Sequence, residues 1–199
     1  MANNNAPAGL VPVEYLSGAP WNGKARRYYI PSSDTNAYAI GDPVTLGGGG
    51  DTQGVPSVVL ATAGSGLVGA IVGAGGLTYG GMSADPTNLN TTVIPATKTK
   101  DYYVLVADDP NTIFEVQEIG TGTALAAADI GLNANLVAGT NSGYQSGWLL
   151  TNTTEAVTAT LDVKLMGLRQ IPGNTFGAYA KWNVLINNHL YRTGIAGKA

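Results

Sequence analysis

Hydrophobic and polar residues alternate in short runs along this chain, between stretches rich in glycine, asparagine and proline. In one such run, residues 182–187 (WNVLIN), Trp182, Val184 and Ile186 occupy every second position. Residues 156–165 (AVTATLDVKL) alternate in the same way. A period of two places successive side chains on opposite faces of a strand, so both runs predict half-buried β-strands.

The same pattern, bounded by turn residues, predicts about nine short strands. They are expected at residues 26–31, 37–46, 55–63, 66–74, 100–109, 112–119, 147–151, 155–171 and 180–191. Residues 41–43 (GDP) predict a bend, and residues 109–111 (DPN) predict a turn that leads one strand back into the next. Residues 47–54 (GGGGDTQG) predict a flexible loop tip and residues 75–92 a long loop.

One short helix is expected within residues 121–136. Thr123 is a suitable N-terminal cap, residues 124–130 (ALAAADI) favour a helix of about two turns, and Gly131 is suited to end it. Residues 1–20 contain Pro7, Pro12 and Pro20 and show no periodic pattern, which predicts an extended arm outside the packed domain.

Together these elements predict an all-β fold. We expect a single-domain, jelly-roll-like β-sandwich or barrel of many short strands with one short helix and an extended N-terminal arm. Residues 1–20 form the arm in this interpretation, and residues 21–199 form the domain. A domain of this length buries about 70% of the surface that its unfolded chain exposes, so it needs no metal or disulfide to fold.

Composition narrows the possible functions. The 199 residues include no cysteine, which excludes zinc–thiolate sites, iron–sulfur clusters and thiol catalysis. The net charge is −3 and only 12% of the residues are charged, so the sequence does not have the basic composition expected of a nucleic-acid binder. The N-terminus shows no signal-peptide pattern, and no apolar stretch reaches the length of a membrane span, so neither is expected.

Residues 64–69 (GSGLVG) match the G-x-G-x-x-G pattern of dinucleotide-binding turns. That site requires a helix to follow, but Gly69 and Gly73 would lie inside it, and the next acidic residue, Asp85, lies in the predicted long loop. We therefore expect no cofactor. The glycines instead predict a hairpin turn between strands at 58–63 and 67–72, with Gly69 and Gly73 allowing close approach of other groups.

Candidate catalytic groups are sparse. His189 is the sole histidine, and we expect it to be a hydrogen-bonded or surface residue rather than a metal ligand. No G-x-S-x-G motif is present. A glycosidase carboxylate pair or calcium ligands could come from Asp101, Asp108, Asp109, Glu115 and Glu118. Asp-Asp-Pro-Asn, however, also suits a plain turn. The sequence thus predicts neither an enzyme nor a metal site.

Arg26 and Arg27 stand beside Tyr28, shortly after Trp21. Arginine and tyrosine together could stack on nucleic acid, but the negative net charge argues against that partner. Tyrosine, tryptophan and arginine are also enriched at protein–protein contacts. These four residues are therefore the predicted protein–protein contacts, with a partner protein or with other copies of the chain.

Three segments carry a resemblance to a known family: residues 6–34 (APAGLVPVEYLSGAPWNGKARRYYIPSSD), 106–118 (VADDPNTIFEVQE) and 177–195 (GAYAKWNVLINNHLYRTGI). They resemble structural proteins of tailed-bacteriophage virions, of the head decoration or cement class. None of the three is a catalytic motif. The resemblance covers most of the chain and is weakest around residues 47–54 and 75–95.

The resemblance implies a non-enzymatic protein on the outer surface of the virion, assembled in the host cytoplasm. Its expected partners are the major capsid protein and further copies of itself, as a small homo-oligomer with a trimer favoured over a dimer. No membrane or nucleic-acid partner is expected. The alternative is a carbohydrate-binding β-sandwich module on the virion surface, with an exposed Trp21, Trp148 or tyrosine residue as stacking platform. A glycoside hydrolase is the least favoured interpretation.

Overall fold

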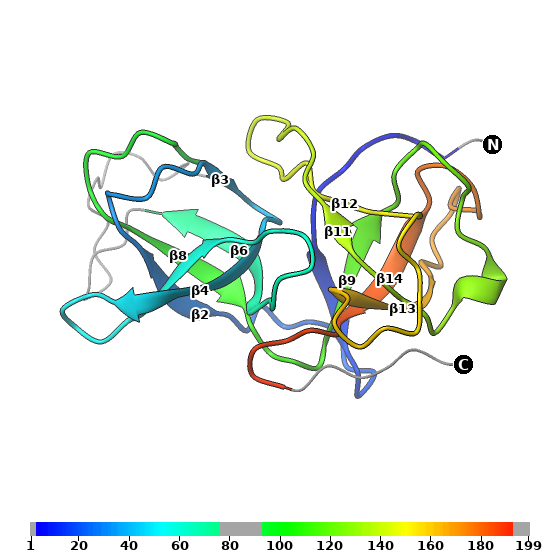
Figure 1. Cartoon of the computed structure of the whole chain (residues 1–199), viewed down its shortest axis with the longest axis horizontal. Helices are drawn as coiled ribbons and strands as arrows, with labels where there is room; N and C mark the ends of the chain where they lie inside the picture. Colours follow the sequence, from blue (N-terminus) through cyan, green and yellow to red (C-terminus); the bar gives the residue numbers. More distant parts are fainter. Residues whose placement is uncertain (1–2, 76–92, 193–199) are drawn as a thin grey trace.

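The computed structural model describes residues 3–75 and 93–192, and it confirms the all-β prediction. Figure 1 shows two groups of strands side by side, a barrel on the left and a sheet on the right. The long loop predicted at residues 75–92 lies almost wholly outside the described residues. No helix in the described part of the chain is long and apolar enough to cross a membrane.

Five strands close into a barrel in the order β2-β5-β4-β6-β8. They are β2 (Arg26–Ile30), β4 (Pro43–Gly50), β5 (Pro56–Leu60), β6 (Gly69–Gly75) and β8 (Tyr102–Ala107). The pairing of β2 with β5 is parallel and the other four pairings are antiparallel. Closure leaves the barrel without the unpaired edge strands that an open sheet has.

The second group is an antiparallel sheet in the order β1-β9-β14-β13-β10. Its strands are β1 (Val11–Tyr15), β9 (Thr112–Gln117), β14 (Lys181–Ile186), β13 (Val163–Leu168) and β10 (Asn133–Ala134). Two small strand pairs accompany these groups. They are β3 (Tyr38–Ala39) with β7 (Val93–Ile94), and β11 (Leu136–Val137) with β12 (Leu149–Leu150).

Two hydrophobic clusters hold the molecule together. The smaller one fills the barrel, and the larger one joins the sheet to the barrel strands through Ala70 and Ala107. Leu60 packs against both clusters. The predicted alternation in the last strand is confirmed, because Trp182 and Val184 are fully buried with Ile186 in the larger cluster. Burial of this apolar surface is the main stabilising contribution to the fold.

The predicted helix is much shorter than expected. Only the 3-10 turn η1 (Ala127–Asp129) forms, and Ala126 before it is extended. The Leu125 N–H donates to Oε1 of the buried Glu118 at 2.8 Å, which holds the chain extended where the helix should begin. Gly131 does end the segment in the left-handed region, with φ 92°.

The predicted flexible tip at residues 47–54 is also corrected, because β4 continues to Gly50. Asp51 then orders the turn, since its Oδ1 accepts the N–H groups of Gln53 and Val55 at 2.8 Å each. Its Oδ2 accepts a 2.5 Å hydrogen bond from the Tyr103 hydroxyl. A carboxylate that accepts three hydrogen bonds fixes the conformation of this glycine-rich turn, because glycine has little conformational preference of its own.

The predicted hairpin around residues 64–69 is wrong, because β5 and β6 do not pair with each other. β4 lies between them and pairs with both. The turn itself exists, with Gly64 at φ 79°. The predicted close approach at Gly69 is confirmed, since a Cβ there would overlap the Ala107 carbonyl oxygen. A Cβ added at Gly73 would lie 3.4 Å from the Leu105 side chain, which is an ordinary van der Waals contact.

Two further strand predictions need correction. The turn at residues 109–111 forms, but it carries the chain from the barrel into the sheet instead of closing a hairpin. The strand predicted at 155–171 begins only at Val163. Asp162 is buried, and its carboxylate accepts the N–H groups of Gly64 and Leu136. Because Gly64 lies in the loop between β5 and β6, the residue before β13 links the sheet to the barrel instead of extending β13.

The N-terminal arm is not outside the packed domain. β1 is an edge strand of the sheet, paired with β9 through Val11 to Tyr15. Leu10 is fully buried in the larger cluster, and its N–H donates to the Gly41 carbonyl at 2.9 Å. Proline at position 12 is compatible with an edge strand, where one side of the backbone needs no partner.

Candidate docking face

The four predicted contact residues do not share one environment. Arg26 is exposed, while Trp21 and Arg27 are partly buried. Tyr28 is only 1% exposed and lies in the barrel core, so it cannot itself contact a partner. The period of two within β2 separates Arg27 from Tyr28, because Tyr28 and Ile30 face the barrel interior. Arg26 has the same parity as Tyr28 but is exposed because it stands at the first position of the strand.

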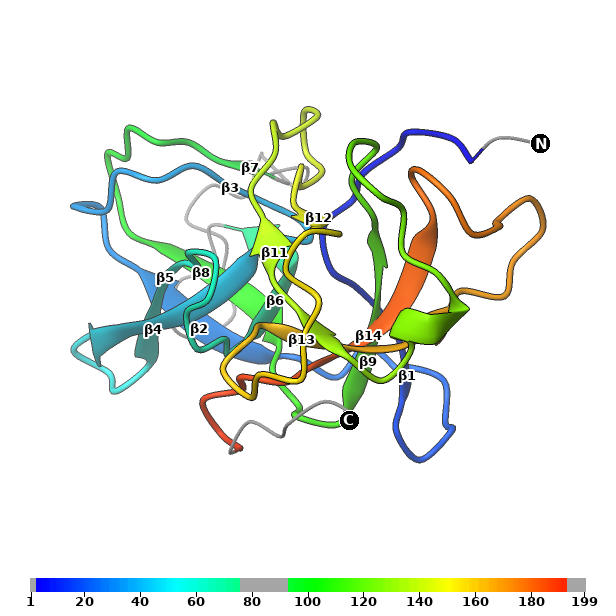
Figure 2. The same ribbon diagram turned by 45° about the vertical axis from the view of Figure 1, so that its right-hand side comes forward.

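Three segments lie along the lower end of the molecule in Figures 1 and 2: residues 16–25, the turn 108–111 and residues 188–192. We call this surface the basal face. The Leu16 N–H donates to the Asn111 carbonyl at 2.8 Å, and Lys24 Nζ lies 3.4 Å from Oδ2 of Asp109. These contacts fix the loop between β1 and β2 against the turn that joins barrel and sheet.

A buried hydrogen-bond chain supports the basal face from beneath. The Tyr28 hydroxyl donates to Oδ2 of Asp108 at 2.6 Å and lies 2.9 Å from the Tyr191 hydroxyl. Burial and these neighbours raise the pKa of Tyr28 far above its ordinary value. Arg26 Nε lies 3.5 Å from the same carboxylate oxygen. Tyr28 is therefore a positioning residue for Arg26 and Tyr191.

Large apolar side chains are exposed on the basal face. Leu16 is 50% exposed, and Leu190 and Tyr191 are 44% exposed each. The sequence interpretation missed all three, because Leu16 fell in the supposed arm and the other two in a supposed strand. The usable signal was Asn187-Asn188, which marks the end of β14 and releases the residues that follow.

A groove of about 490 Å³ opens on the basal face. Its lining is mostly polar and consists of Tyr15, Leu16, Ser17, Asn22, Lys24, Asp109 and Asn111. The Tyr15 hydroxyl donates to Oδ1 of Asn22 at 2.9 Å, so one wall of the groove is held by the chain itself. An apolar side chain beside amides and a lysine suits a partner that combines apolar and polar groups.

His189 lies behind the basal face and is 2% exposed. Its Nδ1 accepts the Tyr191 N–H at 3.1 Å, which agrees with the expectation of a hydrogen-bonded histidine. Burial, and then the charge of Arg192, lowers the pKa of His189 to about 4. The residue is therefore neutral near pH 7 and fixes the turn that presents Tyr191.

The candidate carboxylates are all engaged. Glu115 accepts Lys181 Nζ at 2.8 Å and Arg169 Nε at 3.3 Å. Asp108 and Asp109 are held by the contacts described above, and the Asn111 N–H donates to Oδ1 of Asp109 at 2.9 Å. Among the described residues, no group of three or more histidine, aspartate or glutamate side chains could hold a metal ion.

The tryptophans offer little to a saccharide. Trp148 is 5% exposed, so its predicted use as a stacking platform is wrong. Trp21 is partly buried against the larger cluster, and its Nε1–H donates to the Lys24 carbonyl at 3.3 Å.

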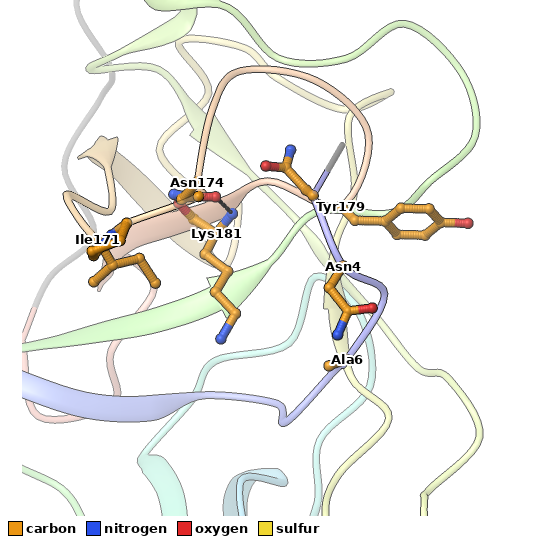
Figure 3. Close-up of a pocket in the computed structure, with 9 residues that line it drawn as sticks. Asn4, Ala6, Ile171, Asn174, Tyr179 and Lys181 are labelled. Carbon is orange, nitrogen blue, oxygen red and sulfur yellow. Dashed lines mark hydrogen bonds between the residues drawn. The ribbon is translucent and has the colours of Figure 1, made fainter. Parts of the chain in front are cut away.

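A second cavity, of about 180 Å³, lies between the N-terminal residues and the loop before β14 (Figure 3). Two of its amides are already in use, because Asn3 bonds the backbone of Thr175 and Ala178, and Asn174 bonds the backbone of Lys181. The Tyr179 ring points away from Lys181 in this view. The cavity therefore marks where the N-terminus is fastened to the domain.

Comparisons of the chain with protein-family models, with curated proteins and with solved structures give no match.

Proposed function

We propose that this protein is a non-enzymatic structural protein of a phage particle, which binds the outside of the capsid lattice and stabilises the head. Its partners are the major capsid protein and further copies of the chain, in a small homo-oligomer with a trimer favoured over a dimer. The basal face is the surface that contacts the shell. The resemblance of the three sequence segments supports the virion assignment.

The observation that carries the proposal is the composition of the basal face. Leu16, Leu190 and Tyr191 are exposed there, and Arg26, whose side chain is 67% exposed, directly follows the first of its three segments. Tyrosine and arginine are enriched among residues that dominate binding energy at protein–protein contacts, and exposed leucine adds apolar area. Exposed side chains of these types on one face of a molecule are typical of an interaction site.

The basal face is also built on a rigid support. Its three segments are anchored by β1, β2, β8 and β14, and the hydrogen-bond chain from Tyr28 orders the side chains beneath it. A pre-ordered surface loses little conformational entropy on binding. Many copies on one lattice would then stiffen a shell through contacts that are individually weak.

The polar groove gives one observation in favour of the alternative, a glycan-binding module. Tyr15 supplies an aromatic ring there, and Ser17, Asn22 and Asp109 supply hydrogen-bonding groups. Aromatic rings beside amide and carboxylate groups suit sugar hydroxyls. Saturable binding on a glycan array that is lost in Tyr15→Ala would favour this function over shell binding.

The proposal is tested by sedimenting the purified protein with capsid shells that lack it. Wild-type protein should pellet with the shells, and the Leu16→Ala/Arg26→Ala variant should remain mostly in the supernatant. Tyr144→Ala is the matched control, because Tyr144 is 58% exposed on the hairpin at the opposite end of the molecule (Figure 1). Equal binding by all three proteins would contradict the assignment of the basal face.

A further inference from the structure

The loop between β1 and β2 contains the one Asn-Gly pair of the sequence, Asn22-Gly23. Both residues are exposed, and a Cβ added at Gly23 would meet nothing within 4 Å. The backbone nitrogen after an asparagine can attack the side-chain carbonyl carbon when no neighbouring side chain obstructs it. Glycine has no side chain, and its backbone freedom permits the geometry that the attack requires.

The side-chain carbonyl of Asn22 is held by two donors. Its Oδ1 accepts the Tyr15 hydroxyl at 2.9 Å and the Lys24 N–H at 3.2 Å. Attack on Cγ transfers negative charge to this oxygen, and two donors already aimed at it stabilise that charge. The arrangement around Cγ of Asn22 is thus that of an oxyanion hole on an exposed loop.

We propose that Asn22 is a site of spontaneous deamidation, activated by Tyr15 and by the Lys24 backbone. The Gly23 nitrogen loses its proton to a solvent base and forms a bond to Cγ of Asn22. The side-chain amide nitrogen gains a proton and leaves as ammonia, which completes a five-membered succinimide ring. Water then opens the ring at either carbonyl and leaves an aspartyl or isoaspartyl residue at position 22.

The product changes the groove of the basal face. A carboxylate replaces an amide beside Asp109, so the local negative charge increases and competes for Lys24. Isoaspartyl linkage also adds one methylene to the main chain between Trp21 and Gly23. The consequence that deamidation weakens docking rests on the proposed function, whereas the modification itself does not.

The modification is tested by incubating the purified full-length protein under mildly alkaline conditions and measuring mass and ammonia release. Exchange of ammonia for water raises the chain mass by about one dalton. Fragmentation of the tryptic peptide that ends at Lys24 should place this gain at Asn22. Asn22→Gln should show no gain there, because the longer side chain does not form the five-membered ring.

The role of the donors is tested with Tyr15→Phe, which removes one hydrogen bond to Oδ1. The rate at Asn22 should fall at least about threefold, while the control Tyr144→Phe should leave it unchanged. No mass gain at Asn22 in the wild-type protein overturns the site, and an unchanged or faster rate in Tyr15→Phe overturns the activation. These readouts require no capsid, so they are independent of the shell-binding test.

Discussion

The Tyr28 hydroxyl donates a 2.6 Å hydrogen bond to Oδ2 of Asp108, and both residues are buried. Tyr28 lies in β2, and Asp108 directly follows β8, the strand that pairs with β2 in the barrel. The phenol has a single proton, so the Tyr191 hydroxyl at 2.9 Å must donate to the Tyr28 oxygen. The hydrogen bonds of Tyr28 to Asp108 and Tyr191 thereby connect the barrel interior to residues 188–192 of the basal face.

Removal of the Tyr28 hydroxyl should destabilise the fold and loosen the basal face together. Hydrogen bonds to charged groups contribute about 1.5–3 kcal/mol, so Tyr28→Phe should lower the free energy of unfolding by about 2 kcal/mol. Urea unfolding followed by tryptophan fluorescence measures this loss. Tyr144→Phe, on an exposed ring, should change stability by less than about 0.5 kcal/mol, and equal losses in both variants would contradict the role of Tyr28.

Close backbone packing at Gly69 leaves no room for a side chain. A Cβ there would overlap the Ala107 carbonyl oxygen, so Gly69→Ala should cost more than about 2 kcal/mol or prevent folding. Gly49 is the matched control within the same barrel, because a Cβ there meets nothing within 4 Å and its φ is not positive. Gly49→Ala should be neutral or slightly stabilising, as thermal unfolding of the two variants would show.

His189 should make the protein sensitive to acid. Its pKa is lowered to about 4 in the folded state, against about 6.5 unfolded, so the unfolded chain binds the proton more readily. The stability linked to His189 is complete above about pH 6.5 and is lost as the pH falls toward 4, a loss of about 3 kcal/mol between pH 7.5 and pH 4.

The comparison with His189→Gln isolates this effect. Burial raises the pKa of Glu118 and Asp162, which shifts stability in the opposite direction over part of the same range. Those carboxyl groups are present in both proteins, so their contribution cancels in the difference. If the difference in unfolding free energy between wild type and variant stays constant from pH 7.5 to pH 4, the assignment to His189 is wrong.

The N-terminal segment should be essential to the fold rather than a removable arm. Leu10 is fully buried, and Leu→Ala in a core costs about 2–5 kcal/mol, so Leu10→Ala should lower stability by about 3 kcal/mol. Leu16→Ala, six positions later and half-exposed, should cost less than about 1 kcal/mol. A stable, fully folded protein after deletion of residues 1–15 would contradict the placement of β1 in the sheet.

Local patterns predicted the strands but not their partners. The alternation around Trp182 identified β14 and its buried face, because period two depends only on neighbouring residues. The position of β4 between β5 and β6 depends on barrel closure, which no local pattern encodes. The turn at Asp109 was predicted for the same local reason, yet the chain leaves it toward a different sheet.

The candidate site was predictable only in part. Trp21, Arg26 and Arg27 were identified by residue type, and the structure places Arg26 on an exposed face. Burial of Tyr28 follows from its facing the interior of a closed barrel, whose closure the sequence does not reveal. Leu190 and Tyr191 escaped notice because the end of β14 is set by buried hydrogen bonds around Asp162.

A cryo-electron microscopy map of the native particle tests the central claim most directly. The account predicts density for this protein on the outer surface of the shell, with residues 16–25, 108–111 and 188–192 facing the major capsid protein. Density inside the shell, a basal face turned toward solvent, or particles that lack the protein would contradict it.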